Sequence, residues 1–272
     1  MLLTTVCLFI AGLIGGFLAG LVGIGGGLVY IFFIPFALRQ TGIPDYEIPQ
    51  YTIANSIFAI LFASAAANYS MFKSQSLFVK EILIIGLTAT LSSLIILHYI
   101  VNTHWYSMEV FNITIVLLLL YMVYMTVMSA NRVMVLKDTE GRNWKMSLVG
   151  IASGSVAALS GLGGGIVVIP VLNALLKIDI KNACSISSGV IMISSFGMTL
   201  FNLVAKPLHD YHNHNVGYIV FPVALALSAG VVISSPMGVK ASRKLSSQNI
   251  SYIYATFLVI VMLKKILELL LK

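Results

Sequence analysis

The chain has 272 residues, of which 59% are hydrophobic and only 9% are charged, and its mean hydropathy is +0.99. Soluble domains carry about 25% charged residues, so this composition excludes a water-soluble globular protein and predicts an integral membrane protein, which we place in the cell membrane. The formal net charge of +7 comes from basic residues between apolar segments. Membrane lipid headgroups are therefore the expected partners, and nucleic acid is not.

The first apolar stretch, from about Thr5 to Leu38, is too long for one straight crossing, because about 20 helical residues span the hydrocarbon core. It contains the sequence Gly-Ile-Gly-Gly-Gly at residues 23–27. Each glycine weakens a helix by about 1 kcal/mol relative to alanine and permits non-helical backbone. We expect a helix that breaks here and restarts near Leu28. The alternative is a continuous helix whose small residues pack closely against a neighbour.

Residues 131–145 form the longest hydrophilic segment and divide the chain into two transmembrane repeats, 1–130 and 146–272. The second repeat also begins with a broken apolar stretch, residues 146–176. We therefore predict an all-α polytopic membrane protein of about eight spans, built from two homologous halves with broken first helices. The expected unbroken spans are residues 51–69, 82–101, 108–129, 183–204, 216–237 and 250–263.

The glycine cluster recurs as Gly-Leu-Gly-Gly-Gly at residues 161–165, 138 positions after the first copy. A second pair of matching motifs, Ala54-Asn55-Ser56 and residues 185–188 (Ser-Ile-Ser-Ser), has a spacing of 132. A duplication followed by shortening of one loop explains both spacings. Internal repeats of this kind are typical of transporters, whose sites lie near the membrane midplane at the repeat interface. The sequence leaves open whether the halves are parallel or inverted.

Residues 16–27 (Gly-Phe-Leu-Ala-Gly-Leu-Val-Gly-Ile-Gly-Gly-Gly) and the second copy, which ends in Ile169-Pro170, resemble the signature of the TauE/SafE family of sulfite-exporter-like membrane proteins. The end of the seventh predicted span, residues 235–238 followed by Arg243, is similar to the family's Gly-rich, Arg-containing segment. The resemblance covers nearly the whole chain. It implies transport, with export the expected direction, of a small anion such as sulfite, a sulfonate or another organosulfur or organic anion.

No predicted span carries a charged residue near its middle, so an anion would be held by neutral donors. Helices that restart inside the membrane, near Leu28 and Ile166, would direct amide groups and a positive dipole end at it. Hydroxyl and amide side chains would complete the shell, although such groups often satisfy only carbonyls of their own helix. The predicted substrate-binding residues are Gly23, Gly25, Gly26, Gly27, Asn55, Ser56, Gly161, Gly163, Gly164, Gly165, Ser187 and Ser188.

The leading hypothesis is a secondary transporter or facilitator for a small anion, without cofactor or catalytic residues. An intramembrane enzyme and a non-transporting membrane scaffold are the alternatives. The former lacks a His-Glu-x-x-His motif and a nucleophile elbow. His209, Asp210, His212 and His214 are interpreted as a solvated loop, so no metal site is predicted. The sequence leaves the coupling ion and the oligomeric state open, a homo-oligomer being one possibility.

Overall fold

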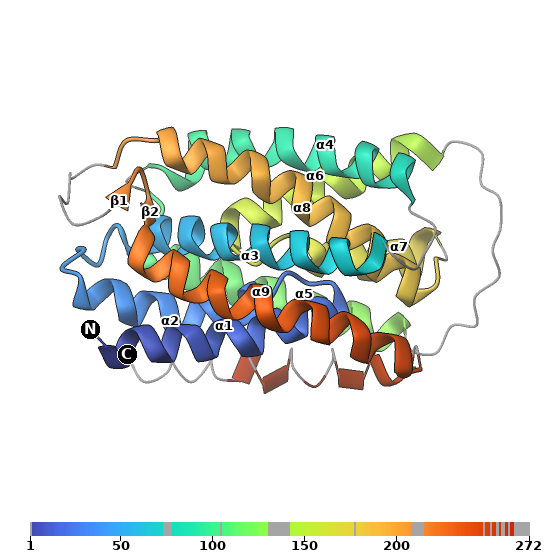
Figure 1. The fold of residues 1–272 in the computed structure, drawn as a ribbon. Coiled ribbons are helices and arrows are strands. Elements are labelled where there is room, and N and C mark those ends of the chain that lie inside the picture. Colours follow the sequence, from blue (N-terminus) through green and yellow to red (C-terminus); the bar gives the residue numbers. More distant parts are fainter. Residues whose placement is uncertain are drawn as a thin grey trace.

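The computed structural model is a bundle of long helices that lie side by side (Figure 1). The residues that it describes are 2–72, 78–103, 105–129, 142–176, 178–207, 215–246, 248–250 and single residues of the last segment up to 263. Within these ranges, five helices are long and apolar enough to cross a membrane, and two shorter helices are also apolar. Most of the predicted linker and the predicted eighth span lie outside the described elements.

The helices begin and end close to the predicted spans, except for the seventh. Its apolar stretch starts with a two-stranded antiparallel hairpin around Gly217, whose φ of 58° favours glycine. The helices are α1 Leu2–Val22, α2 Gly27–Gln40, α3 Ile48–Phe72, α4 Val79–Ile96 with a π-helical turn η1 Leu97–Val101, α5 Met108–Ser129, α6 Arg142–Ser160, α7 Gly165–Leu176, α8 Ile180–Val204 and α9 Phe221–Lys244. The strands are β1 Asn215–Val216 and β2 Ile219–Val220.

Each broken apolar stretch folds back on itself as a helical hairpin. In the first, the Thr4 hydroxyl near the start of α1 bonds the Gln40 side chain at the end of α2, and Gly15 of α1 packs against the ring of Tyr30 in α2. In the second, Ser153 of α6 contacts the residue before α7. The chain therefore returns to the end of the bundle at which it entered, which the sequence did not decide.

The long helices that follow the two hairpins, α3 and α8, run in opposite directions. Ile60 of α3 and Ile191 of α8 both flank Gly25. Nearer the end of α3, Asn68 donates a hydrogen bond to the carbonyl of Ser188, which lies nearer the start of α8. Because the contact moves forward along one helix and backward along the other, α3 and α8 are antiparallel.

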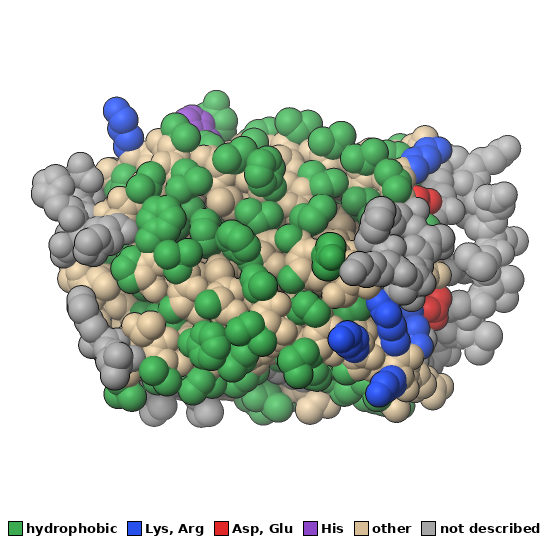
Figure 2. Space-filling model, viewed as in Figure 1, with side chains coloured by type: hydrophobic (Ala, Val, Ile, Leu, Met, Phe, Trp, Pro, Cys, Tyr) green, Lys and Arg blue, Asp and Glu red, His purple; other side chains and the backbone are tan. Residues whose placement is uncertain are grey.

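Glycine stripes bring the outer helices into backbone contact. Gly12, Gly16 and Gly20 of α1 lie against α9, where an added Cβ at Gly12 would be 2.3 Å from the Leu227 carbonyl oxygen. Gly154 of α6 lies as closely against α4. Small residues at a spacing of four are how membrane helices approach one another. Apolar side chains cover the side of the bundle, as an integral membrane protein requires (Figure 2).

Candidate functional site at the two helix interruptions

Both glycine clusters interrupt their helices as predicted. Six of their glycines have φ between 66° and 89°, a region that other residues rarely adopt. They occupy matching positions in the two copies, so the same turn is built twice. These glycines are Gly23, Gly25, Gly26, Gly161, Gly163 and Gly164.

The last glycine of each cluster is required by close contact instead. A Cβ at Gly27 would lie 2.7 Å from the Gly161 carbonyl oxygen, and one at Gly165 would lie 2.7 Å from the Gly23 carbonyl oxygen. Each restarted helix therefore begins against the first glycine of the other interruption. The structure brings the two predicted clusters together in the buried centre of the bundle.

Two serines complete this crossed arrangement. Ser56 of α3 donates a hydrogen bond of 2.7 Å to the Gly161 carbonyl, and Ser187 of α8 donates one of 2.8 Å to the Gly23 carbonyl. Both serines are fully buried. Ser56 and Ser187 therefore occupy matching positions, at a spacing of 131 residues. The predicted spacing of 132, which pairs Ser56 with Ser188, is wrong by one residue. The carbonyl of Ser188 instead accepts a hydrogen bond from Asn68.

Asn55 precedes Ser56 in α3, but its side chain points to the β1–β2 hairpin. Its amide nitrogen donates to the carbonyls of Tyr51 and Tyr218, and its oxygen accepts a 2.9 Å bond from the Val220 amide. In this conformation the side chain therefore fixes β1–β2 to α3. A role for Asn55 in binding a substrate stays a prediction.

A buried tyrosine outside the predicted site residues distinguishes the two interruptions. The Tyr30 hydroxyl lies beside Gly26, in the place that the Ser153 hydroxyl takes beside Gly164. Ser153 donates a 3.1 Å hydrogen bond to the Gly164 carbonyl, whereas the Tyr30 hydroxyl has no partner among the described residues. The sequence already shows this difference between the two copies, because Gly15 and Tyr30 of the first copy match Ser153 and Val168 of the second.

The start of α2 offers amide groups to a ligand. Gly26 caps this helix of 14 residues without a side-chain hydrogen bond. The first amides of a helix lack the carbonyl four residues before them, and the helix dipole places a partial positive charge there. In α2 the Val29 amide already donates a 3.0 Å hydrogen bond to the Gly26 carbonyl, so the amides of Gly27 and Leu28 are the ones that a ligand could use. Such an end attracts anions. The neighbouring unpartnered hydroxyl of Tyr30 is a further donor.

These features define a class of protein: an integral membrane protein whose interrupted helical hairpins meet in the middle of an apolar helix bundle. The chain belongs to the sulfite exporter TauE/SafE family, whose model matches residues 8–265. It is accordingly a membrane transporter.

Three curated relatives are similar over almost their whole length, and each is named a "probable membrane transporter protein". The relative from Methanocaldococcus jannaschii is 28% identical over 92% of this chain and 91% of its own. The Haemophilus influenzae relative is 26% identical over 96% of this chain and 97% of its own. YunE of Bacillus subtilis is 24% identical over 94% of this chain and 95% of its own. No solved structure gives a significant match.

Proposed function

We propose that this protein is a secondary transporter or facilitator that exports a small anion, sulfite or a small organosulfonate, across the cell membrane. The description of its family as sulfite exporters supports the substrate class. The observation that carries the proposal is the crossing of the two interruptions. Each helix start lies against the other's first glycine, and a serine from α3 or α8 lies beside each crossing.

The substrate site in this proposal lies at the contact between the two interruptions, which the predicted glycines form together with Ser56 and Ser187. In the present conformation the two hydroxyls donate to protein carbonyls. An entering anion with several oxygens would compete for these hydroxyls and for the amides at the start of α2. Neutral donors suit a transported anion because they bind it without the deep well of a buried ion pair.

We further propose that residues 1–130 and 146–272 are two inverted repeats joined by residues 131–145. The predicted total of about eight spans then counts each interrupted hairpin as one span that does not cross the membrane. The antiparallel course of α3 and α8 supports the inversion. In inverted repeats the same site can be opened to either side by exchanging the conformations of the halves. Alternating access of this kind requires no ATPase domain.

The charge distribution supports an orientation. Most of the Lys and Arg side chains on the visible face gather at the end of the bundle where α9 ends (Figure 2). Cytoplasmic loops carry an excess of basic residues, so we place this end, called the basic end below, in the cytoplasm. Of the described residues, Lys80, Lys145, Lys181, Lys240, Arg243 and Lys244 lie at the basic end, whereas Arg39 and Lys206 lie at the other.

The test is flux in proteoliposomes with matched serine variants. Purified protein is expected to move labelled sulfite or ethanesulfonate down its gradient, and Ser56→Ala or Ser187→Ala should each lower this flux by about 2- to 10-fold, the value of one hydrogen bond. The controls are Ser64→Ala and Ser195→Ala, two buried serines of the same helices whose hydroxyls, among the described residues, donate to carbonyls of their own helix. Equal losses in site and control variants would contradict the site, and no flux of any anion would favour a scaffold.

A further inference from the structure

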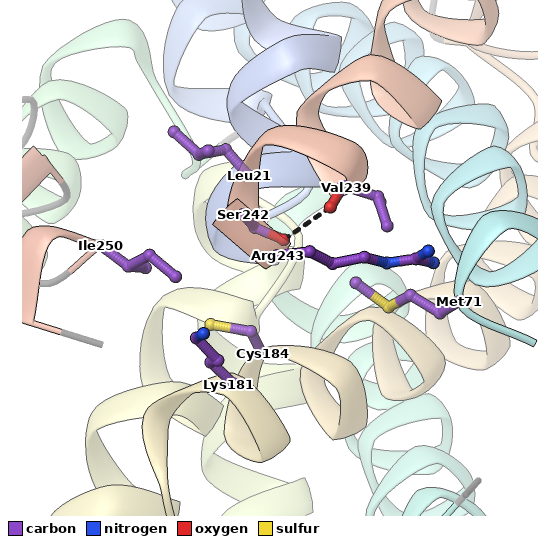
Figure 3. Close-up of a pocket in the computed structure, with 8 residues that line it drawn as sticks. All are labelled: Leu21, Met71, Lys181, Cys184, Val239, Ser242, Arg243 and Ile250. Carbon is purple, nitrogen blue, oxygen red and sulfur yellow. Dashed lines mark hydrogen bonds between the residues drawn. The ribbon is translucent and has the colours of Figure 1, made fainter. Parts of the chain in front are cut away.

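A cavity of about 120 Å³ opens at the basic end, where α1, α3 and α9 meet the start of α8 (Figure 3). Its lining includes Lys181 and Arg243, the hydroxyl-bearing Ser242 and the thiol-bearing Cys184. None of the described residues that line it is acidic. The volume is far below the roughly 300–1,000 Å³ of pockets for drug-sized ligands, so it suits a small group.

The Arg243 side chain lines this cavity and extends from α9 toward α3 (Figure 3). Its guanidinium donates a 2.7 Å hydrogen bond to the Ser70 carbonyl near the end of α3, which fixes the charge between α9 and α3. Lys181 contributes a second positive charge from the first turn of α8. Asp179 caps the same helix through the Lys181 amide, at 3.1 Å. Two cations facing one small cavity favour a ligand with an oxyanion group.

The floor of the cavity adjoins the first interruption. The cavity is lined there by Leu21, two residues before Gly23, and by Cys184. A Cβ at Gly23 would lie 2.6 Å from the Cys184 carbonyl oxygen. Ser187, one turn further along α8, donates its hydrogen bond to the Gly23 carbonyl. The cavity therefore adjoins the backbone of the first interruption at Gly23.

The matching place at the other end of the bundle is closed. At a spacing of 131, Gln50 matches Lys181 and Ile53 matches Cys184, and Ile53 packs on Gly161 as Cys184 packs on Gly23. Gln50 is buried, and its amide donates hydrogen bonds of 3.0 and 3.2 Å to the carbonyls of Val101 and Tyr106. Among the described residues, these bonds close the place that the cavity would occupy by symmetry.

We propose that this cavity is a staging site, in which Arg243 and Lys181 hold the sulfonate or sulfite group of the substrate before it passes Cys184 to the interruptions. This inference rests on the proposed function, because the staging site would be the entrance to the proposed substrate site. The same chemistry would fit the phosphate of a lipid headgroup, and the experiment separates these sources.

Cys184 supplies a reporter for this staging site. In a Cys7→Ser background, the modification rate of Cys184 is measured with a methanethiosulfonate reagent carrying a sulfonate and with one carrying a trimethylammonium group. We expect the anionic reagent to react several-fold faster and ethanesulfonate to slow it. Arg243→Gln and Lys181→Gln should each bring the two rates together, whereas Lys206→Gln, at the opposite end, should leave their ratio unchanged.

Three results would overturn the proposal. One is no reaction at Cys184 in protein that transports anions, and another is equal rates for the two reagents in the parent. The third is protection by phosphatidylglycerol vesicles but not by ethanesulfonate, which would make the cavity a headgroup site. Charge-selective modification that persists in protein without anion flux would instead leave the cavity as an anion site and refute the proposed function.

Discussion

Replacing Tyr30 with phenylalanine tests whether the Tyr30 hydroxyl binds the ligand or stabilises the fold. The Tyr30 hydroxyl is fully buried beside Gly26 and has no partner among the described residues. A buried donor without a partner costs about 1–3 kcal/mol. Tyr30→Phe keeps the ring that packs on Gly15, so we expect the substrate-free protein to be as stable as the parent or more stable by about 1 kcal/mol.

The same substitution should weaken anion binding. A hydrogen bond to a charged group contributes about 1.5–3 kcal/mol, and 1.4 kcal/mol corresponds to a factor of ten, so the Kd for the transported anion should rise by about 10- to 100-fold. Ser153→Ala, at the corresponding place in the other half, should lower stability by about 0.5–1.5 kcal/mol because it removes a hydrogen bond that is made.

Thermal unfolding in detergent, with and without ethanesulfonate, measures both effects, and KM for flux checks the second. The reasoning is refuted if Tyr30→Phe lowers the unfolding temperature as Ser153→Ala does while the anion still stabilises the variant to the same extent. That outcome would assign the hydroxyl a structural partner.

Two further substitutions probe the crossing and the closed end. Gly27→Ala should cost about 1–3 kcal/mol and reduce flux, because its Cβ would lie 2.7 Å from the Gly161 carbonyl oxygen. The same change at Gly42 meets nothing within 4 Å but strains the backbone at a φ of 83°, so it should lower stability without lowering the flux of the folded protein. Equal flux in both variants would count against the crossing. Gln50→Ala removes both hydrogen bonds that close the other end of the bundle. In protein without other cysteines, the substitution Ile53→Cys introduces a thiol there, and Gln50→Ala should speed the modification of this thiol. An unchanged rate would show that other contacts close this end.

Local sequence features predicted the helices and their breaks well. Long apolar runs gave α5 from Met108 to Ser129 with the same bounds, and the clustering of glycines located both interruptions. The start of α9 was misplaced because Val216–Val220 is apolar and continuous with the span, so hydropathy does not separate a two-stranded hairpin from a helix end.

The contacts between distant elements could not be predicted in the same way. Periodicity along one segment carries no information on the direction of its neighbour, so the sequence does not predict that α1 and α2 form a hairpin. The contact between Thr4 and Gln40 shows that they do. The crossed bond from Ser56 to Gly161 joins residues 105 positions apart. Comparing the copies residue by residue would have revealed Tyr30, since valine stands at the matching position.

The differences between the copies allow the states open to either side to differ in free energy. Two identical inverted halves would make the states open to either side equal in free energy, so each would be populated equally. Here the closed end has a neutral Gln50 bonded to two carbonyls, whereas the open end has the cation Lys181 at the matching position. Each 1.4 kcal/mol of difference between the two seals shifts the ratio of the two states about tenfold. With the orientation proposed above, Lys181 would favour the state that presents its cations to an anion on the cytoplasmic side.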